Sequence, residues 1–239
     1  MDYLPSIQIE TQHYLGFDIA RPSASIIWLH GLGASGQDFA DLVPELIKNL
    51  KLDVKSPNIR CIFPHADKIP VTINGGFVMP AWYDILDMPS EPNAERKINT
   101  QQLQGSVANI QRLINREIKR GVASENILLL GFSQGGAVAY HAALTYPEAL
   151  AGLAGLSTYF PTQDLNFSPS ENNEDIDIQI YHGSFDPVVN ESLGVKAQKD
   201  LEALGYQTSY QSYPMQHQLC LEQVEDIAHW IKQKLLEKK

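Results

Sequence analysis

The sequence predicts an α/β fold, a single domain built on a mostly parallel sheet flanked by helices. Short apolar runs at 25–29 and 127–130 have the composition of buried parallel strands. Each run leads through a glycine-containing turn into a segment with apolar residues at helical spacing, at 37–50 and 134–146. The same order returns as a strand at 176–182, a helix at 191–204 and a strand at 207–213. Strands that alternate with helices are typical of parallel sheets whose connections are helices.

Length and composition agree with one domain over residues 1–239. A chain of 239 residues with 44% hydrophobic residues can bury a substantial core. No internal repeat or long linker interrupts it. The polar stretch 161–175 is predicted to be a solvated surface turn and not a domain boundary.

The charge of the chain excludes several classes of partner. The formal net charge is -10, and Lys and Arg cluster only at the short carboxyl end, so we expect no nucleic-acid partner and no attraction to anionic membranes. Residues 1–5 lack the features of a signal peptide, and no apolar run is long enough to span a bilayer. We expect a cytoplasmic protein, in which Cys61, in a predicted strand, and Cys220 stay unpaired.

The motif GFSQG at 131–135 places Ser133 at the joint between a predicted strand and a predicted helix. That is the position of the nucleophile in a nucleophile elbow. The sharp turn needs small residues on both sides of the serine, and Gly131, Gly135 and Gly136 meet this need. By itself the pentapeptide fits an ordinary Gly-Ser turn equally well.

Two later loops hold a candidate acid and a candidate base. Asp186 follows the strand at 176–182, and His217 follows the strand at 207–213. Both lie at carboxyl ends of strands, where open α/β sheets place their ligand sites. The order Ser133, Asp186, His217 is that of one known class of catalytic triad. Taken alone, Asp186 before a proline is equally well explained as a turn stabiliser, so the hypothesis depends on the three occurring together.

The remaining histidines show no comparable placement, and no metal-ligand spacing is found. We expect neither a metal nor another cofactor. The histidines interpreted as surface or packed residues are His13, His65, His141, His182 and His229.

A glycine-rich turn at 30–36 follows the strand at 25–29. It lacks the Lys-Ser/Thr pair of a P-loop and the full GxGxxG spacing, so phosphate binding is disfavoured. A turn that begins His-Gly after this early strand is where such folds present a donor to a developing oxyanion. We assign the backbone N–H groups of Leu32 and Gln134 to that oxyanion hole.

These motifs resemble the carboxylesterase and acyl-protein thioesterase branch of the α/β-hydrolases, the phospholipase/carboxylesterase family, over nearly the whole chain. The resemblance implies a single-domain α/β-hydrolase with Ser133 as nucleophile, His217 as base and Asp186 as acid. The matching segments are HGLG at 30–33, FPHA at 63–66, PVT at 70–72, MPAWYDI at 79–85, GFSQGGA at 131–137, HG at 182–183 and DPVV at 186–189.

One position departs from the family pattern. The family usually has a Gly or Met before the catalytic His and a small residue after it, whereas Gln216 and Gln218 flank His217 here. A glycine there eases the path of the loop, so Gln216 leaves open the loop conformation, the local access and whether activity is narrowed or weakened, but not the identity of the base.

The segment 68–84 carries many apolar residues on a predicted loop. They either fold back onto the core or, as the resemblance implies, form a flap and an apolar groove beside the serine. We predict that Ile73, Met79, Trp82 and Val188 line a groove that binds an acyl chain.

The function expected is hydrolysis of carboxylic esters or thioesters with an apolar acyl chain, through an acyl-serine intermediate. Short-chain esters, lysophospholipids and S-acylated proteins are all compatible substrates. Outside the enzymes, the chain could be a binding module that retains the fold with Ser133 idle, or a protein recruited to membrane surfaces by its apolar loop. A weak homodimer through the flap is a further possibility.

Overall fold

The computed structural model describes residues 3–17, 21–89, 91, 94, 96–162 and 167–237. These residues form a central seven-stranded sheet in the order β1-β3-β2-β8-β9-β10-β11. All neighbouring strands pair in parallel except β1, which runs antiparallel to β3 at one edge. The sheet strands are β1 (Ser6–Glu10), β2 (Ala24–Leu29), β3 (Ile59–Pro64), β8 (Ile127–Phe132), β9 (Gly152–Leu156), β10 (Ile178–Gly183) and β11 (Thr208–Tyr213). The predicted fold class is confirmed.

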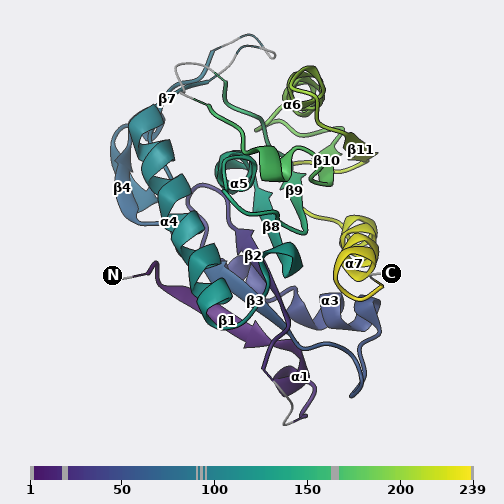
Figure 1. Ribbon diagram of the computed structural model, residues 1–239. Helices are drawn as coiled ribbons and strands as arrows, with labels where there is room; N and C mark the ends of the chain where they lie inside the picture. Colours follow the sequence, from purple (N-terminus) through teal and green to yellow (C-terminus); the bar gives the residue numbers. More distant parts are fainter. Residues whose placement is uncertain are drawn as a thin grey trace.

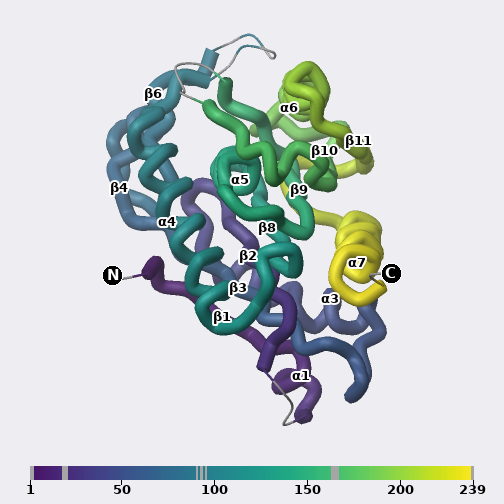
Figure 2. The backbone as a smooth tube through the Cα atoms, viewed as in Figure 1, coloured from purple at the N-terminus to yellow at the C-terminus, as the bar shows by residue number. Residues whose placement is uncertain are grey.

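Helices cover both faces of the sheet, and the tube view shows the two layers clearly (Figure 1, Figure 2). Successive side chains of β2 point to opposite faces of the sheet. Ile27 and Leu29 pack in the core cluster that contains residues of α4, α5 and α6. Ile26 and Trp28 pack in the cluster that contains residues of α2, α3 and α7. The helices are α1 (Thr11–Tyr14), α2 (Gly36–Ala40), α3 (Val43–Leu50), α4 (Thr100–Lys119), α5 (Gln134–Leu144), α6 (Glu191–Ala203) and α7 (Leu221–Leu235), with 3-10 turns η1 (Thr72–Asn74), η2 (Ser124–Asn126) and η3 (Glu171–Asn173).

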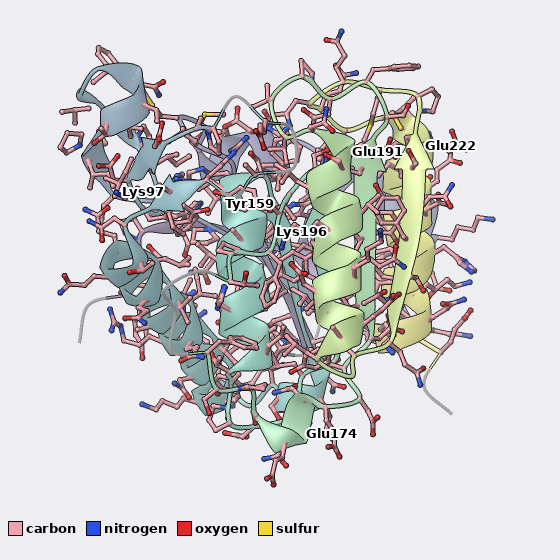
Figure 3. All side chains as sticks on the ribbon, turned by 90° about the horizontal axis from the view of Figure 1, so that it is seen from above. Lys97, Tyr159, Glu174, Glu191, Lys196 and Glu222 are labelled. Carbon is pink, nitrogen blue, oxygen red and sulfur yellow. The ribbon has the colours of Figure 1, made fainter. Side chains whose placement is uncertain are left out.

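The strand order places the site. From β2 the sheet grows toward β3 on one side and toward β8 on the other, so β2 and β8 flank the point at which the strand order reverses. In open α/β sheets the ligand site lies at the carboxyl ends of the strands that flank this point. In Figure 3 this edge lies in the upper part of the picture: Glu191 and Glu222, at the starts of α6 and α7, lie there, whereas Glu174, which precedes β10, lies at the bottom.

The structure differs from the sequence prediction at the helix expected over 37–50, which is two helices. Pro44 lies in the first turn of α3 and has no N–H to donate to the carbonyl of Ala40, the last residue of α2. The backbone therefore breaks at Asp41 and Leu42.

The stretch 161–175 is more firmly anchored than a solvated turn. Asn173 is buried, and its side chain accepts a hydrogen bond from the Leu150 amide at 2.9 Å and donates to the Tyr146 carbonyl at 2.8 Å. Residues 163–166 of this stretch lie outside the described residues.

The segment 68–84, predicted to be a loop, contains an antiparallel hairpin. Its strands are β4 (Lys68–Val71) and β5 (Phe77–Pro80), joined through η1, and a second small pair is formed by β6 (Ile85–Asp87) and β7 (Lys97–Ile98). We call residues 68–84 the flap. Gly75 and Gly76 both have positive φ, which allows the tight turn between the two strands.

Candidate active site

Ser133 occupies a strained turn between β8 and α5. Its φ of 53° and ψ of −123° lie outside the regions that a residue with a side chain normally adopts. Such a conformation costs about 1–3 kcal/mol and persists only where the surrounding structure enforces it. The turn directs a serine that is only 6% exposed toward the carboxyl edge of the sheet.

The glycines around Ser133 are required by close packing. A Cβ at Gly131 or at Gly135 would lie closer than 3.0 Å to a backbone carbonyl oxygen, that of Gly135 or of His30 respectively. A Cβ at Gly136 would lie 2.6 Å from the side chain of Thr158. The hydroxyl of Thr158 also donates a hydrogen bond to the Ser133 carbonyl at 2.6 Å, which stabilises the strained turn.

Ser133, His217 and Asp186 are brought together at this edge from three separate loops. The Nε2 atom of His217 lies 3.0 Å from the Oγ of Ser133, and its Nδ1 lies 2.6 Å from Oδ2 of Asp186. Asp186 can only accept at this contact when it is ionised, so Nδ1 carries the proton and Nε2 is left to accept the proton of the serine hydroxyl. Phe132 packs against the imidazole with ring centroids 4.7 Å apart and limits its movement.

Asp186 is buried but remains a carboxylate. Burial by itself would raise the pKa of Asp186, but the hydrogen bond and charge of His217 and the amides of Val189 and Val188 outweigh it and lower the pKa. Both amides donate to Oδ1 at 2.8 Å. The acid is therefore ionised at neutral pH and is held on both oxygens.

The loop that carries His217 is held by backbone hydrogen bonds from the loop that carries Asp186. The amides of Ser184 and Phe185 donate to the carbonyls of Tyr213 and Met215 at 2.8 and 3.1 Å. Gly183 allows this approach, because a Cβ there would lie 2.5 Å from the Gln216 carbonyl.

The departure at Gln216 is accommodated without strain. Gln216 and Gln218 are exposed, and neither is among the residues that have positive φ. The Gln218 amide donates to the Gln216 carbonyl at 2.9 Å and closes the turn around His217. A glycine is therefore not needed at position 216 for the loop conformation observed in this chain.

The glycine-rich turn after β2 lies directly against the serine. A Cβ at Gly31 would lie 3.3 Å from the Cβ of Ser133. The buried ring of His30 fixes the turn, because its Nε2 accepts from the Ala66 amide at 3.1 Å and its Nδ1 therefore donates to the Gly31 carbonyl at 2.7 Å. Leu32, the next residue, packs partly buried against the core. Gln134 is the first residue of α5, where a backbone N–H has no acceptor within the helix.

The side chain of Gln134 has a structural role that sequence reasoning missed. Its Oε1 accepts from the Trp82 amide at 2.9 Å, and its Nε2 donates to the Tyr83 carbonyl at 2.7 Å. Trp82 in turn donates its indole N–H to the His30 carbonyl at 2.8 Å. The base of the flap is thus tied to the residue that follows the serine. A polar residue at the start of an alanine-rich helix was the available signal.

The four residues predicted to line an acyl groove differ in their surroundings. Ile73 packs partly buried against the core, and Met79 lies near Gly33, whose amide donates to the Pro80 carbonyl at 2.8 Å. Trp82 is buried, at 3% exposure, while Val188 is 48% exposed beside Asp186. The flap itself presents Phe77 and Val78, at 68% and 56% exposure.

Two interactions hold the flap at its base. The backbone N–H and hydroxyl of Thr72 donate to the two carboxylate oxygens of Asp84 at 2.7 and 2.6 Å. The amide of Asp84 donates to Gln102 of α4 at 2.6 Å. These hydrogen bonds attach the base of the flap to α4.

Two kinds of feature are missing from the described part of the chain. Within it, no three His, Cys, Asp or Glu side chains are grouped so that they could hold a metal ion. Nor is any helix there both long enough and apolar enough to cross a membrane.

Comparisons with known proteins identify the family of the chain. The family model described as Phospholipase/Carboxylesterase matches residues 18–235. Acyl-protein thioesterase 1 of Neurospora crassa is 35% identical over 223 residues, which cover 91% of this chain and 89% of that protein.

Two crystal structures have the same fold. SOBER1 of Arabidopsis thaliana has a TM-score of 0.78 at 31% identity and covers 89% of this chain and 99% of its own. Acyl-protein thioesterase 2 of Zea mays has a TM-score of 0.77 at 25% identity, covering 98% of this chain and 100% of its own. The chain belongs to the phospholipase/carboxylesterase family of α/β-hydrolases and is a serine hydrolase of esters or thioesters.

Proposed function

We propose that the protein hydrolyses esters and thioesters of apolar acyl chains with Ser133 as nucleophile, His217 as general base and acid, and Asp186 as the group that orients His217. The observation that supports this assignment most strongly is the continuous hydrogen-bonded line from Ser133 through His217 to Asp186, at 3.0 and 2.6 Å. The strained backbone of Ser133 supports it independently.

In the first half of the reaction, Nε2 of His217 takes the hydroxyl proton as the Oγ of Ser133 attacks the acyl carbonyl. The amides of Leu32 and Gln134 stabilise the negative charge on the carbonyl oxygen, and the dipole of α5 points its positive end at the same atom. The imidazolium of His217, stabilised by Asp186, then gives its proton to the departing alkoxide or thiolate. The acyl group stays on Ser133.

In the second half, His217 takes a proton from water as that water attacks the acyl-serine. The tetrahedral intermediate collapses, the proton returns to the Oγ of Ser133, and the carboxylic acid leaves. No cofactor is needed at any step, since every proton is moved by His217.

We propose thioesters of acylated proteins as the first substrate class to test, with small carboxylic esters and lysophospholipids as alternatives. The relatives at 35% and 25% identity are named acyl-protein thioesterases, and the site is open to solvent beside Val188. The acyl groove of Ile73, Met79, Trp82 and Val188 is part of this proposal.

The experiment is a rate panel of p-nitrophenyl esters from acetate to octanoate and matching acyl thioesters, with Ser133→Ala as control. We expect kcat of that variant to fall about a million-fold while the fold is retained. Retention of most activity would reject Ser133 as nucleophile and would favour an idle binding module.

The groove is tested on the same panel. Each methylene that it buries contributes about 0.8 kcal/mol, so kcat/KM should rise with acyl length. Val188→Ser should flatten this rise, whereas Val54→Ser, a matched change at another half-exposed valine, should leave it unchanged. A flat profile in the unmodified enzyme contradicts the groove.

We also propose a cytoplasmic location, since both Cys61 and Cys220 are unpaired thiols. Cys61 is buried, and burial raises its pKa to about 12, so its thiolate is not available for reaction. A weak homodimer stays a prediction, which sedimentation velocity at two concentrations tests.

A further inference from the structure

His182 is a buried histidine at the end of β10, four residues before Asp186, with 0% exposure. Its Nε2 lies 2.8 Å from the Val189 carbonyl. A carbonyl only accepts, so Nε2 carries the proton and Nδ1 does not. Within the described residues Nδ1 has no hydrogen-bond partner, a situation that costs about 1–3 kcal/mol. We expect His182 to have a role that offsets the cost of its unpaired Nδ1.

The imidazole of His182 stays neutral. Burial lowers its pKa, and this effect outweighs the opposing influence of the Val189 carbonyl and of the carboxylates of Asp186 and Glu191. His217, the other titratable group that faces it, also lowers the pKa. His182 therefore acts through a fixed N–H group and not through charge.

The Nε2–H group of His182 stabilises the turn that positions Asp186. Val189 accepts from His182 with its carbonyl and donates to Oδ1 of Asp186 with its amide at 2.8 Å. The Nε2 of His182 also lies 3.8 Å from Oδ2 of Asp186, the oxygen that accepts from His217 at 2.6 Å. The protonated nitrogen of His182 thus also lies near the carboxylate oxygen that the two amides do not contact.

A glycine in α6 makes room for the imidazole. A Cβ at Gly194 would lie closer than 3.0 Å to Nδ1 of His182. Glycine inside a helix costs about 0.5–1 kcal/mol relative to alanine. The position of this imidazole is therefore accompanied by two locally unfavourable features, the unpaired Nδ1 of His182 and the glycine inside α6.

We propose that His182 is a positioning residue for the reaction: it fixes the turn 186–189 so that Asp186 meets His217 in the orientation that proton transfer needs. This inference rests on the proposed function, because it assigns His182 a role in orienting the same triad.

The test compares His182→Leu with His182→Gln. Leucine removes the donor, whereas the glutamine amide can donate to Val189 from nearly the same place. We expect His182→Leu to lower kcat 10- to 100-fold with KM within twofold, because a shift of about 1 Å in a reacting group costs on this order. His182→Gln should restore kcat to within about fivefold of the unmodified enzyme. Gly194→Ala should reproduce the loss seen with leucine and provides the test if the leucine variant does not fold.

The matched control is His141→Gln. His141 is also buried and also contacts a backbone carbonyl, that of Pro161 at 2.9 Å, but it lies two turns along α5 from the serine. Its replacement should leave kcat and KM unchanged. A ¹⁵N spectrum of the histidine rings should show His182 protonated at Nε2 only.

Failure of this inference can be told apart from failure of the proposed function. If the unmodified enzyme hydrolyses esters in a Ser133-dependent way and His182→Leu keeps full kcat, losing only thermal stability, the positioning role is overturned. A His182 ring protonated at Nδ1 also overturns it, whatever the activity. If no Ser133-dependent hydrolysis is found, the proposed function fails first and this inference falls with it.

Discussion

Replacing Asp186 by asparagine tests the electrostatics of the triad without changing its shape. Oδ1 of Asp186 accepts from the amides of Val188 and Val189 at 2.8 Å, and Oδ2 accepts from His217 at 2.6 Å. An asparagine has one oxygen and one NH₂ group. Because two backbone N–H groups require the oxygen, the NH₂ group comes to lie opposite Nδ1 of His217.

Two donors cannot share that contact, so His217 must change tautomer. Its Nδ1 then accepts from Asn, and its Nε2 carries the proton that faces the Oγ of Ser133. An Nε2 that is already protonated cannot take the serine proton. We expect kcat to fall about 10⁴-fold, or about 5.5 kcal/mol in the barrier, with KM little changed because Asp186 does not reach the substrate.

The assay is saturation kinetics on p-nitrophenyl butyrate, together with the rate of labelling by a fluorophosphonate probe, which reports the nucleophilicity of Ser133 directly. Thermal unfolding at neutral pH checks that the variant is folded. If Asp186→Asn kept more than a tenth of kcat, the tautomer argument would be refuted and another residue would have to orient His217.

The same variant has a signature in acid. The folded pKa of Asp186 lies below the ordinary value of 3.8, so ionisation of this group stabilises the fold above that value, and the stabilisation is lost as the pH falls through the folded pKa. The asparagine variant lacks this loss, so its unfolding temperature should depend less on pH in that range.

Four further substitutions test other parts of the structure. Gly131→Ala places a Cβ against the Gly135 carbonyl, so it should destabilise the protein by more than about 2 kcal/mol in urea unfolding and abolish labelling of Ser133. The control is Gly105→Ala in α4, where the added Cβ meets no heavy atom within 4 Å. It should stabilise the protein by about 0.5–1 kcal/mol. His141→Gln should make the stability of the fold less sensitive to acid. Burial lowers the pKa of His141 to about 4, so the native protein loses up to about 3 kcal/mol of stability as the pH falls from 6.5 to that value. An equal pH dependence of unfolding in the variant would contradict this. Gln216→Gly should leave kcat/KM within twofold, since the native residue is exposed and not at positive φ, and a large gain in activity would show that the glutamine obstructs the site.

Parts of the site that depend on local sequence were predictable. The strands predicted at 127–130, 176–182 and 207–213 agree within two residues with β8, β10 and β11, and the turns after them carry Ser133, Asp186 and His217. Because parallel strands in one sheet share a carboxyl edge, residue types that follow such strands converge even when they are far apart in the sequence. The triad residues could therefore be named from the strand ends, the motif around Ser133 and the order of the three residue types, before any distance was known.

Interactions between distant segments were beyond the reach of that reasoning. Nothing local to Gln134 indicates that its side chain ties down Trp82 and Tyr83, which lie 52 and 51 residues away. The flap was predicted to be a loop because its prolines and glycines obscure the pairing of β4 with β5. His182 was predicted to be either a surface residue or a packed one. It is packed, but its contact with the turn that carries Asp186 depends on how that turn folds back over β10.

The sequence by itself determined the order of strands and helices, the sites of the sharp turns and the chemistry available at each strand end, because these depend on side-chain periodicity and on the backbone freedom of neighbouring residues. Only the tertiary structure decided which oxygen meets which nitrogen. Hydrogen bonds form within a few tenths of an ångström, and that placement is set by the packing of the whole sheet and its helices.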